Sequence, residues 1–144
     1  MKQKSARLAL ESAFRNAYFR VTCAGREFIR RIGQIDHAAD AALKTAGCRS
    51  HWAILTPCNP DARKLSDADN AIRLATLRQQ LDALKLRYLP SINSAADGSW
   101  PEPGCCVLDA APVLTDELAR QYAQLAYVGA KLGEAPALCW MPKP

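Results

Sequence analysis

The segment HWAILTPCNP, residues 51–60, decides the fold class of this chain. Its first six residues form a short apolar run that stops at Pro57, which is typical of a strand buried inside a sheet. An amphipathic helix is predicted next, with Ser66 as its N-cap and an apolar stripe made of Leu74, Leu77, Leu81 and Leu84. A buried strand followed by such a helix indicates a sheet with helices packed against it.

Further elements are predicted on both sides of this unit. Apolar residues at helical spacing between Leu10 and Tyr18 predict an opening helix, and β-favouring residues predict a hairpin that turns at Ala24-Gly25. Asp36 is expected to cap a short second helix and Thr115 to cap the last one. Further strands are expected at about 86–92, 104–108, 126–128 and 137–140.

We therefore predict an α/β protein of the α+β type, with a mixed β-sheet packed by about three to four helices. The main helices are expected at about 36–46, 67–86 and 115–124. No linker, repeat or low-complexity tract divides the sequence, so residues 1–144 should form a single domain. Within it, residues 1–17 form a basic helical segment and residues 18–140 form the α/β core.

The composition is typical of a globular protein, with 49% hydrophobic and 23% charged residues. No stretch approaches the roughly 20 apolar residues of a membrane span, and charged residues interrupt the start of the chain where a signal peptide would be apolar. We therefore expect a cytoplasmic protein with no membrane association. The six cysteines should then be free thiols. Cys48, His51 and Cys58 are the only grouping that hints at zinc, and the second ligand pair of a structural site is missing, so we expect no metal and no cofactor.

The formal net charge of +5 is concentrated at the N-terminus. Residues 1–35 contain eight Lys or Arg and only two Asp or Glu, whereas the rest of the chain is nearly balanced. Such an excess can attract nucleic acid or an acidic partner, but it also occurs on ordinary solvated surfaces. Nucleic-acid binding through this segment is possible but not favoured.

Four polar residues stand where a purely structural interpretation fits poorly. Asn59 lies in a turn between two prolines, and Asn70 heads the leucine stripe of the predicted helix, where an apolar side chain is expected. Glu102 follows Trp100-Pro101 directly before a predicted strand, and Gln124 lies near the end of the last helix. A purely structural role is also possible for each of them. Asparagine can form hydrogen bonds with its own backbone in a turn. A carboxylate in a loop and an amide on a helix surface are commonly solvated.

Chain direction suggests that these four residues meet. The strand that contains Trp52 runs toward Asn59, and the next helix starts at the same end with Asn70. If the strand at 104–108 is antiparallel to it, Glu102 and Gln124 return to that end too. We therefore predict a crevice at one sheet edge, with Asn59, Asn70, Trp100, Glu102 and Gln124 as ligand-binding residues and Trp52 nearby.

The short motifs around these residues resemble a bacterial family, the domain of unknown function 3293. The resemblance rests on Thr56-Pro57-Cys58-Asn59-Pro60, Ser66-x-x-Asp69-Asn70, Trp100-Pro101-Glu102 and Gln124-x-Ala126, and covers about 18–140. The sequence departs from the family pattern at three places: Cys58 replaces an aromatic residue, Asp69 replaces glutamate, and Pro103-Gly104 replaces a serine. The resemblance implies no function, because none is assigned to the family.

Three functional hypotheses remain open. The first is a binding or interaction module whose partner is a small polar ligand or another protein. The second is a small enzyme acting on a polar or nucleotide-like substrate, with Glu102 as the candidate catalytic acid or base. The third is nucleic-acid binding through the basic N-terminal segment. No phosphate loop, nucleophile elbow or zinc-protease motif occurs in the sequence, which is why the first hypothesis is preferred.

Overall fold

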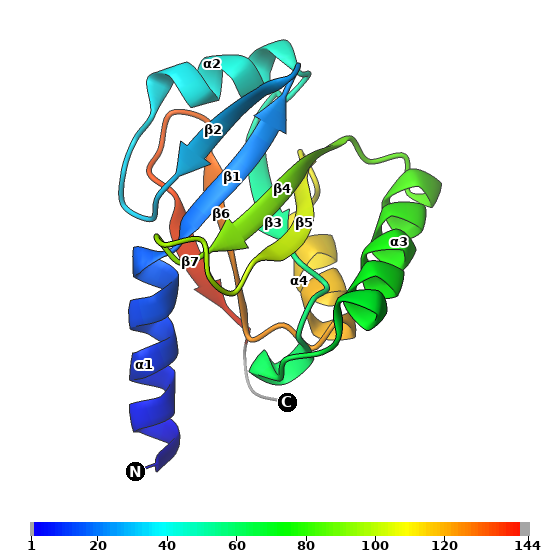
Figure 1. Cartoon of the computed structure of the whole chain (residues 1–144). Helices are drawn as coiled ribbons and strands as arrows, with labels where there is room; N and C mark the ends of the chain where they lie inside the picture. The colour runs from blue at the N-terminus through cyan, green and yellow to red at the C-terminus, as the bar shows by residue number, and fades with distance from the viewer. Residues whose placement is uncertain (1, 142–144) are drawn as a thin grey trace.

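A computed structural model describes the backbone of residues 2–141 and the side chains of residues 6–141. In that part of the chain, seven strands form one sheet and four α-helices pack around it (Figure 1). The helices are α1 Lys2–Asn16, α2 His37–Thr45, α3 Asp67–Ala83 and α4 Pro112–Gln121, with a 3-10 turn η1 at Pro60–Ala62. The strands are β1 Tyr18–Cys23, β2 Arg26–Arg30, β3 His51–Leu55, β4 Tyr88–Ser94, β5 Glu102–Leu108, β6 Ala126–Lys131 and β7 Ala137–Trp140. The chain thus forms a single α+β domain, as predicted.

The sheet has the order β2-β1-β4-β5-β3-β6-β7, and every neighbouring pair among the described strands is antiparallel. The expectation of a mixed sheet was therefore wrong. Helix α3 does connect two strands that run in the same direction, β3 and β4, but β5 lies between them and is antiparallel to both. In the same way α4 connects β5 to β6 across β3. Strand–helix–strand units predict parallel strands, but the sequence does not show that another strand inserts between them.

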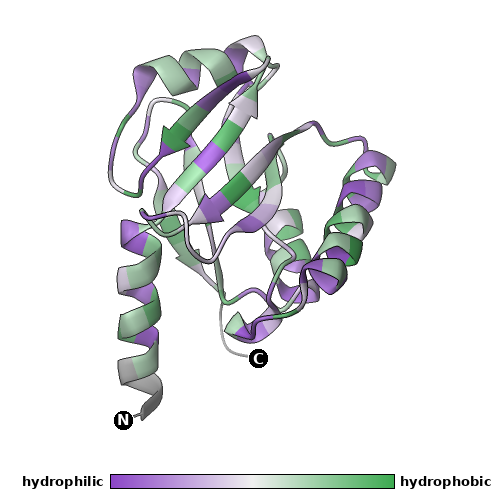
Figure 2. Ribbon diagram, viewed as in Figure 1, coloured by the Kyte–Doolittle hydropathy of each residue, from purple (hydrophilic) through white to green (hydrophobic). Residues whose placement is uncertain are grey.

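Each face of the sheet has its own hydrophobic core. On one face α2 packs on a cluster that includes Phe19, Trp52, Ile54 and Cys106. On the other face α3 and α4 cover a cluster that consists of Leu55, Leu77, Leu81, Cys105, Val107, Ala110, Leu118, Ala119 and Tyr122. Hydrophobic residues alternate with hydrophilic ones along the helices in Figure 2, as expected for elements with one buried side. Among the described residues, no helix combines the length and the apolar character that crossing a bilayer requires.

Two of the three predicted helix caps are confirmed. The Asp36 carboxylate accepts a hydrogen bond from the Ala39 N–H at 3.0 Å, and the Ser66 hydroxyl accepts one from Asp69 at 3.1 Å. Thr115 was predicted to cap the last helix, but α4 already begins at Pro112, and Thr115 is buried within its first turn. Proline favours this first position because its missing N–H would have no intrahelical partner there. Leu84 also differs from expectation, since it ends α3 and is 46% exposed.

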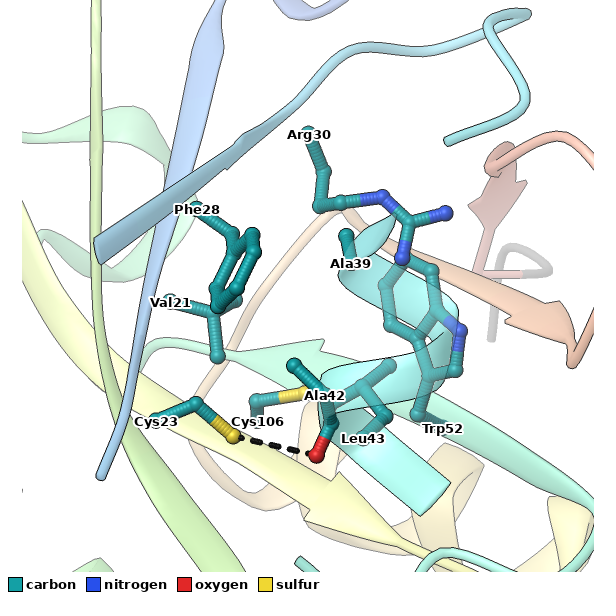
Figure 3. A pocket seen from close by; sticks show the side chains of 9 residues that line it. All are labelled: Val21, Cys23, Phe28, Arg30, Ala39, Ala42, Leu43, Trp52 and Cys106. Carbon is teal, nitrogen blue, oxygen red and sulfur yellow. Dashed lines mark hydrogen bonds between the residues drawn. The ribbon is translucent and has the colours of Figure 1, made fainter. Parts of the chain in front are cut away.

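A buried ion pair links β2 to α2. Arg30 is 1% exposed and donates to the Asp40 carboxylate at 3.1 Å. The guanidinium carbon lies 4.8 Å from the centre of the Trp52 ring, and Figure 3 shows the two side chains next to each other beside a void of about 10 Å³. The other Asp40 oxygen accepts the Gly133 N–H at 3.2 Å, so one carboxylate connects α2, β2 and the β6–β7 turn.

Asp40→Ala should destabilise the fold by about 3–5 kcal/mol, because it leaves the Arg30 charge buried without a partner. Urea unfolding measured by circular dichroism checks this. The double variant Arg30→Met/Asp40→Leu removes both charges and should lose much less stability. Equal losses in the single and double variants would contradict this account of the pair.

Candidate functional site

The loop after β3 has an unusual backbone. Asn59, Asp61 and Ala62 all have positive φ angles, at 52°, 54° and 58°. Residues other than glycine adopt this left-handed conformation rarely, and they keep it only where surrounding contacts enforce it. The loop that contains the Thr56–Pro60 motif is therefore held in place by its neighbours.

The Asn59 side chain supplies most of these contacts. Its carbonyl oxygen accepts hydrogen bonds from the Leu65 N–H and the Asn70 amide, both at 2.9 Å. Its own amide donates to the Glu102 carboxylate at 2.8 Å, and its backbone N–H donates to the side-chain carbonyl oxygen of Asn70 at 3.0 Å. Asn59 is only 6% exposed. It thus joins its loop to α3 and β5 through three hydrogen bonds, and the fourth, from Leu65, closes the loop on itself.

Asn70 lies in the first turn of α3 and is bonded to the 56–65 loop, as the sequence predicted. The expectation that it is buried was wrong, because its side chain remains partly exposed. The hydrogen bonds of its side chain go to Asn59, and they do not by themselves remove the side chain from solvent. Asn70 acts through Asn59 and does not itself line the cleft described below.

Glu102 begins β5 and lies opposite Asn93 of β4 in the strand register. Burial raises the pKa of the Glu102 carboxyl above its usual value, and side-chain hydrogen bonds from Asn59 and Trp100 partly oppose this. Trp100 is 48% exposed and also has a positive φ, at 54°. The Lys64 ammonium lies 5.6 Å from the centre of the Trp100 ring. A partly buried carboxylate and an indole ring therefore share one edge of the sheet.

Gln124 follows α4 and does not belong to it, since the helix ends at Gln121 rather than at 124. Its amide donates to the Cys58 carbonyl at 2.8 Å and to the Tyr122 carbonyl at 3.2 Å. Close by, the Asp61 N–H donates to the Ala123 carbonyl at 2.8 Å. The loop after β3 is thus tied to the segment between α4 and β6.

These elements surround a cleft of about 490 Å³. Four of the five predicted residues line it: Asn59, Trp100, Glu102 and Gln124. The walls are largely apolar and come from α1, the residue that follows it, and β6, with Leu10, Ala13, Phe14, Ala17, Ala126 and Val128. A cleft of this size with a few polar groups at one end has the dimensions and composition of a small-molecule site.

Trp52 does not belong to this cleft, contrary to expectation. It is the second residue of β3, lies opposite Leu108 and four residues before Thr56, and is buried against α2 beside Arg30. The strand that contains Trp52 does run toward Asn59, as predicted, but Trp52 does not lie near the cleft. Trp52 and Trp100, which were predicted to lie near the same crevice, lie in different environments. Trp52 is near the start of β3, whereas Trp100 lies beside the loop that follows the end of β3.

Three features of the site were not predicted. Arg73 fixes the loop by donating to the Pro57 carbonyl at 2.6 Å and to the Tyr122 carbonyl at 2.9 Å. Its position one turn after Asn70 was an available signal, because residues at this spacing share a helix face. Asn93 and the apolar side of α1 also line the cleft. Nothing in the sequence shows that α1 folds back toward β6.

Two of the residues that depart from the family pattern, Cys58 and Gly104, have structural roles here. The thiol of Cys58 is buried, donates to the Pro103 carbonyl at 3.4 Å, and has a raised pKa because of burial. A side chain at Gly104 would place its Cβ only 2.2 Å from the Leu55 carbonyl oxygen. Glycine therefore lets β5 approach β3 closely just after Glu102.

The cysteines and histidines do not assemble into a metal site. Among the described residues, no group of three or more His, Cys, Asp or Glu side chains is arranged to hold a metal ion. Cys48 and His51 instead lie in and next to the loop that precedes β3, where the Cys48 thiol donates to the His51 carbonyl at 3.3 Å. The cysteines that the structure describes are all free thiols.

The fold and the cleft define the protein as a single α+β domain with an antiparallel sheet and a largely apolar cleft that is lined in part by a carboxylate–amide network. The family model described as "Protein of unknown function (DUF3293)" matches residues 55–127, which is just over half of the chain. The chain belongs to this family. The matched segment contains Asn59, Asn70, Trp100, Glu102 and Gln124. No curated protein and no solved structure matches the chain.

Asn70→Leu should lower the free energy of unfolding by about 1–3 kcal/mol, because it leaves the Asn59 N–H and carbonyl without these partners. Gln79→Leu makes a similar change at an exposed position of α3 and should alter stability much less. Thermal unfolding of both variants checks the difference. If the two variants melted at the same temperature, the network would not stabilise the loop.

Proposed function

We propose that this protein is a binding module that holds a small molecule in the cleft between α1, the loop after β3 and β6. The observation that carries the proposal is the cleft itself, about 490 Å³ in volume, with apolar walls and a Glu102–Asn59 hydrogen bond at its polar end. Small-molecule sites combine such walls with a few well-placed polar groups that orient the ligand.

The polar end of the cleft is preorganised. Asn59 accepts a hydrogen bond from Asn70 of α3, and Gln124 donates one to the Cys58 carbonyl. Arg73 fixes the same loop by donating to the Pro57 carbonyl. A ligand would meet side chains whose orientation is already fixed, which reduces the entropy lost on binding. The left-handed loop residues are consistent with this interpretation, because strained backbone is often found at ligand sites.

Filling the cleft should abolish binding. Ala13→Trp adds a large side chain to the α1 wall, whereas Ala41→Trp makes the same change on an exposed position of α2, outside the cleft. A small-fragment library screened by ¹⁵N NMR should give shifts centred on Asn59, Gln124 and Val128 in the natural sequence and in Ala41→Trp, and none there in Ala13→Trp. Fragments that bind elsewhere, or equally well to Ala13→Trp, would refute the proposal.

One observation favours a second candidate, a small enzyme in which Glu102 is the general acid or base. Burial raises the pKa of this carboxyl within the cleft, and perturbed carboxyls in clefts are common in active sites. The second candidate differs from the first in what Glu102 does, because a catalytic carboxyl must exchange a proton with the bound molecule.

Glu102→Gln separates the two candidates. The glutamine can still accept the Asn59 hydrogen bond, and since burial disfavours the ionised carboxyl, the melting temperature at neutral pH should stay unchanged or rise slightly. A binding module should lose affinity for its ligand in this variant. An enzyme should keep most of its affinity and lose turnover. Melting far below the natural protein would show that Glu102 has a structural role instead.

The contacts of the basic segment among the described residues are intramolecular and do not favour the nucleic-acid hypothesis. The Arg7 guanidinium lies 4.4 Å from the centre of the Trp140 ring, and Arg15 contacts Glu11 at 3.4 Å. Phe14, one of the aromatic residues among these arginines, packs edge-on against Trp140. Arg7, Arg15 and Phe14 of α1 therefore all make contacts within the protein itself.

A further inference from the structure

We infer that the cleft takes a primary amine with an apolar body, whose ammonium group binds at Glu102. This inference names the ligand class of the cleft and rests on the proposed binding function. It follows from the charge of the polar end, from the hydrogen-bond acceptors that remain there, and from the shape of the cleft.

The charge at the polar end is negative, and no basic side chain among the described residues forms an ion pair with it. Glu102 is the one charged side chain that lines the described cleft. The ion pairs found among the described residues join Arg15 to Glu11, Arg20 to Glu27 and Arg30 to Asp40, and none includes Glu102. A carboxylate removed from water is costly unless a positive charge compensates it. A cationic ligand would supply that charge.

Three basic side chains near the cleft contact groups other than the Glu102 carboxylate. Arg20 donates to Ser94 at 2.6 Å and faces Glu27, while Arg73 donates to two backbone carbonyls. Lys64 lies over the Trp100 ring and is exposed. None of them makes a hydrogen bond or ion pair with the Glu102 carboxylate in the described structure, so they leave it available to a ligand.

The hydrogen-bonding capacity that remains at this end is mainly that of acceptors. The Asn59 amide and the Trp100 indole N–H both donate to the Glu102 carboxylate, and the Gln124 amide is used on two backbone carbonyls. The Gln124 carbonyl accepts no hydrogen bond from a described residue, and the buried Asn93 Oδ1 has no partner either. An ammonium group carries three donors and no acceptor, so it fits a site that offers free acceptors.

Trp100 adds an aromatic face at the same place. Indole rings attract cations through the negative potential of their faces, and the Lys64 ammonium at 5.6 Å already shows this for the Trp100 ring. The rest of the cleft is far larger than an ammonium group. Its walls of Leu10, Phe14 and Val128 favour an apolar body, which is released from water on binding.

The test compares n-octylamine with n-octanol and n-octanoate, three probes with the same chain length and different head groups. Each is titrated into the ¹⁵N-labelled full chain, and the shifts of cleft residues give its affinity. The same titrations are repeated with Glu102→Gln and with Glu134→Gln, which changes an exposed carboxylate in the β6–β7 turn.

Octylamine should bind at least about tenfold more tightly than octanol, because a hydrogen bond between charged groups is stronger than one to a neutral hydroxyl. Octanoate should bind most weakly. Glu102→Gln should remove the preference for the amine and Glu134→Gln should keep it. If octanol or octanoate binds in the cleft as well as octylamine, the ligand class is wrong while the binding function stands. If no probe shifts the cleft residues, both proposals fail.

Discussion

The hydrogen bonds of Asn59 are the constraint on which the rest of the site depends. One amide side chain joins the loop after β3, the start of α3 and the start of β5, three segments separated by up to 43 residues in sequence. A buried amide that makes all of its hydrogen bonds is stabilising, whereas one that is left unpaired is costly, so the three segments are held in one arrangement. This arrangement places Glu102 at the polar end of the cleft.

The antiparallel insertion of β5 is the second requirement. Because β5 lies between β4 and β3, its first residue emerges beside the loop that follows β3. Gly104 permits this close approach, since a side chain there would collide with the Leu55 backbone. The sheet topology and the hydrogen-bond network therefore reinforce each other, and both lead to the same edge of the molecule.

Much of the secondary structure could be predicted because it depends on local chemistry. Asp36 and Ser66 mark helix starts through side-chain caps, and the leucines of α3 follow the helical period. The meeting of Asn59, Glu102 and Gln124 could also be anticipated, because strand direction alone brings them to one end. Thr115 failed as a cap because Pro112 offered an earlier start with no side-chain cap.

The sequence by itself determined the element types, the family, and the identity of the polar residues that meet at the sheet edge. Only the tertiary structure decided which strands are neighbours, and with them the all-antiparallel sheet. It also decided that α1 forms a wall of the cleft, that Arg73 clamps the loop, and that Trp52 packs on Arg30 far from Glu102. The physical reason is that caps and periodicity act over a few residues, whereas strand order and side-chain contacts depend on packing between segments distant in the chain.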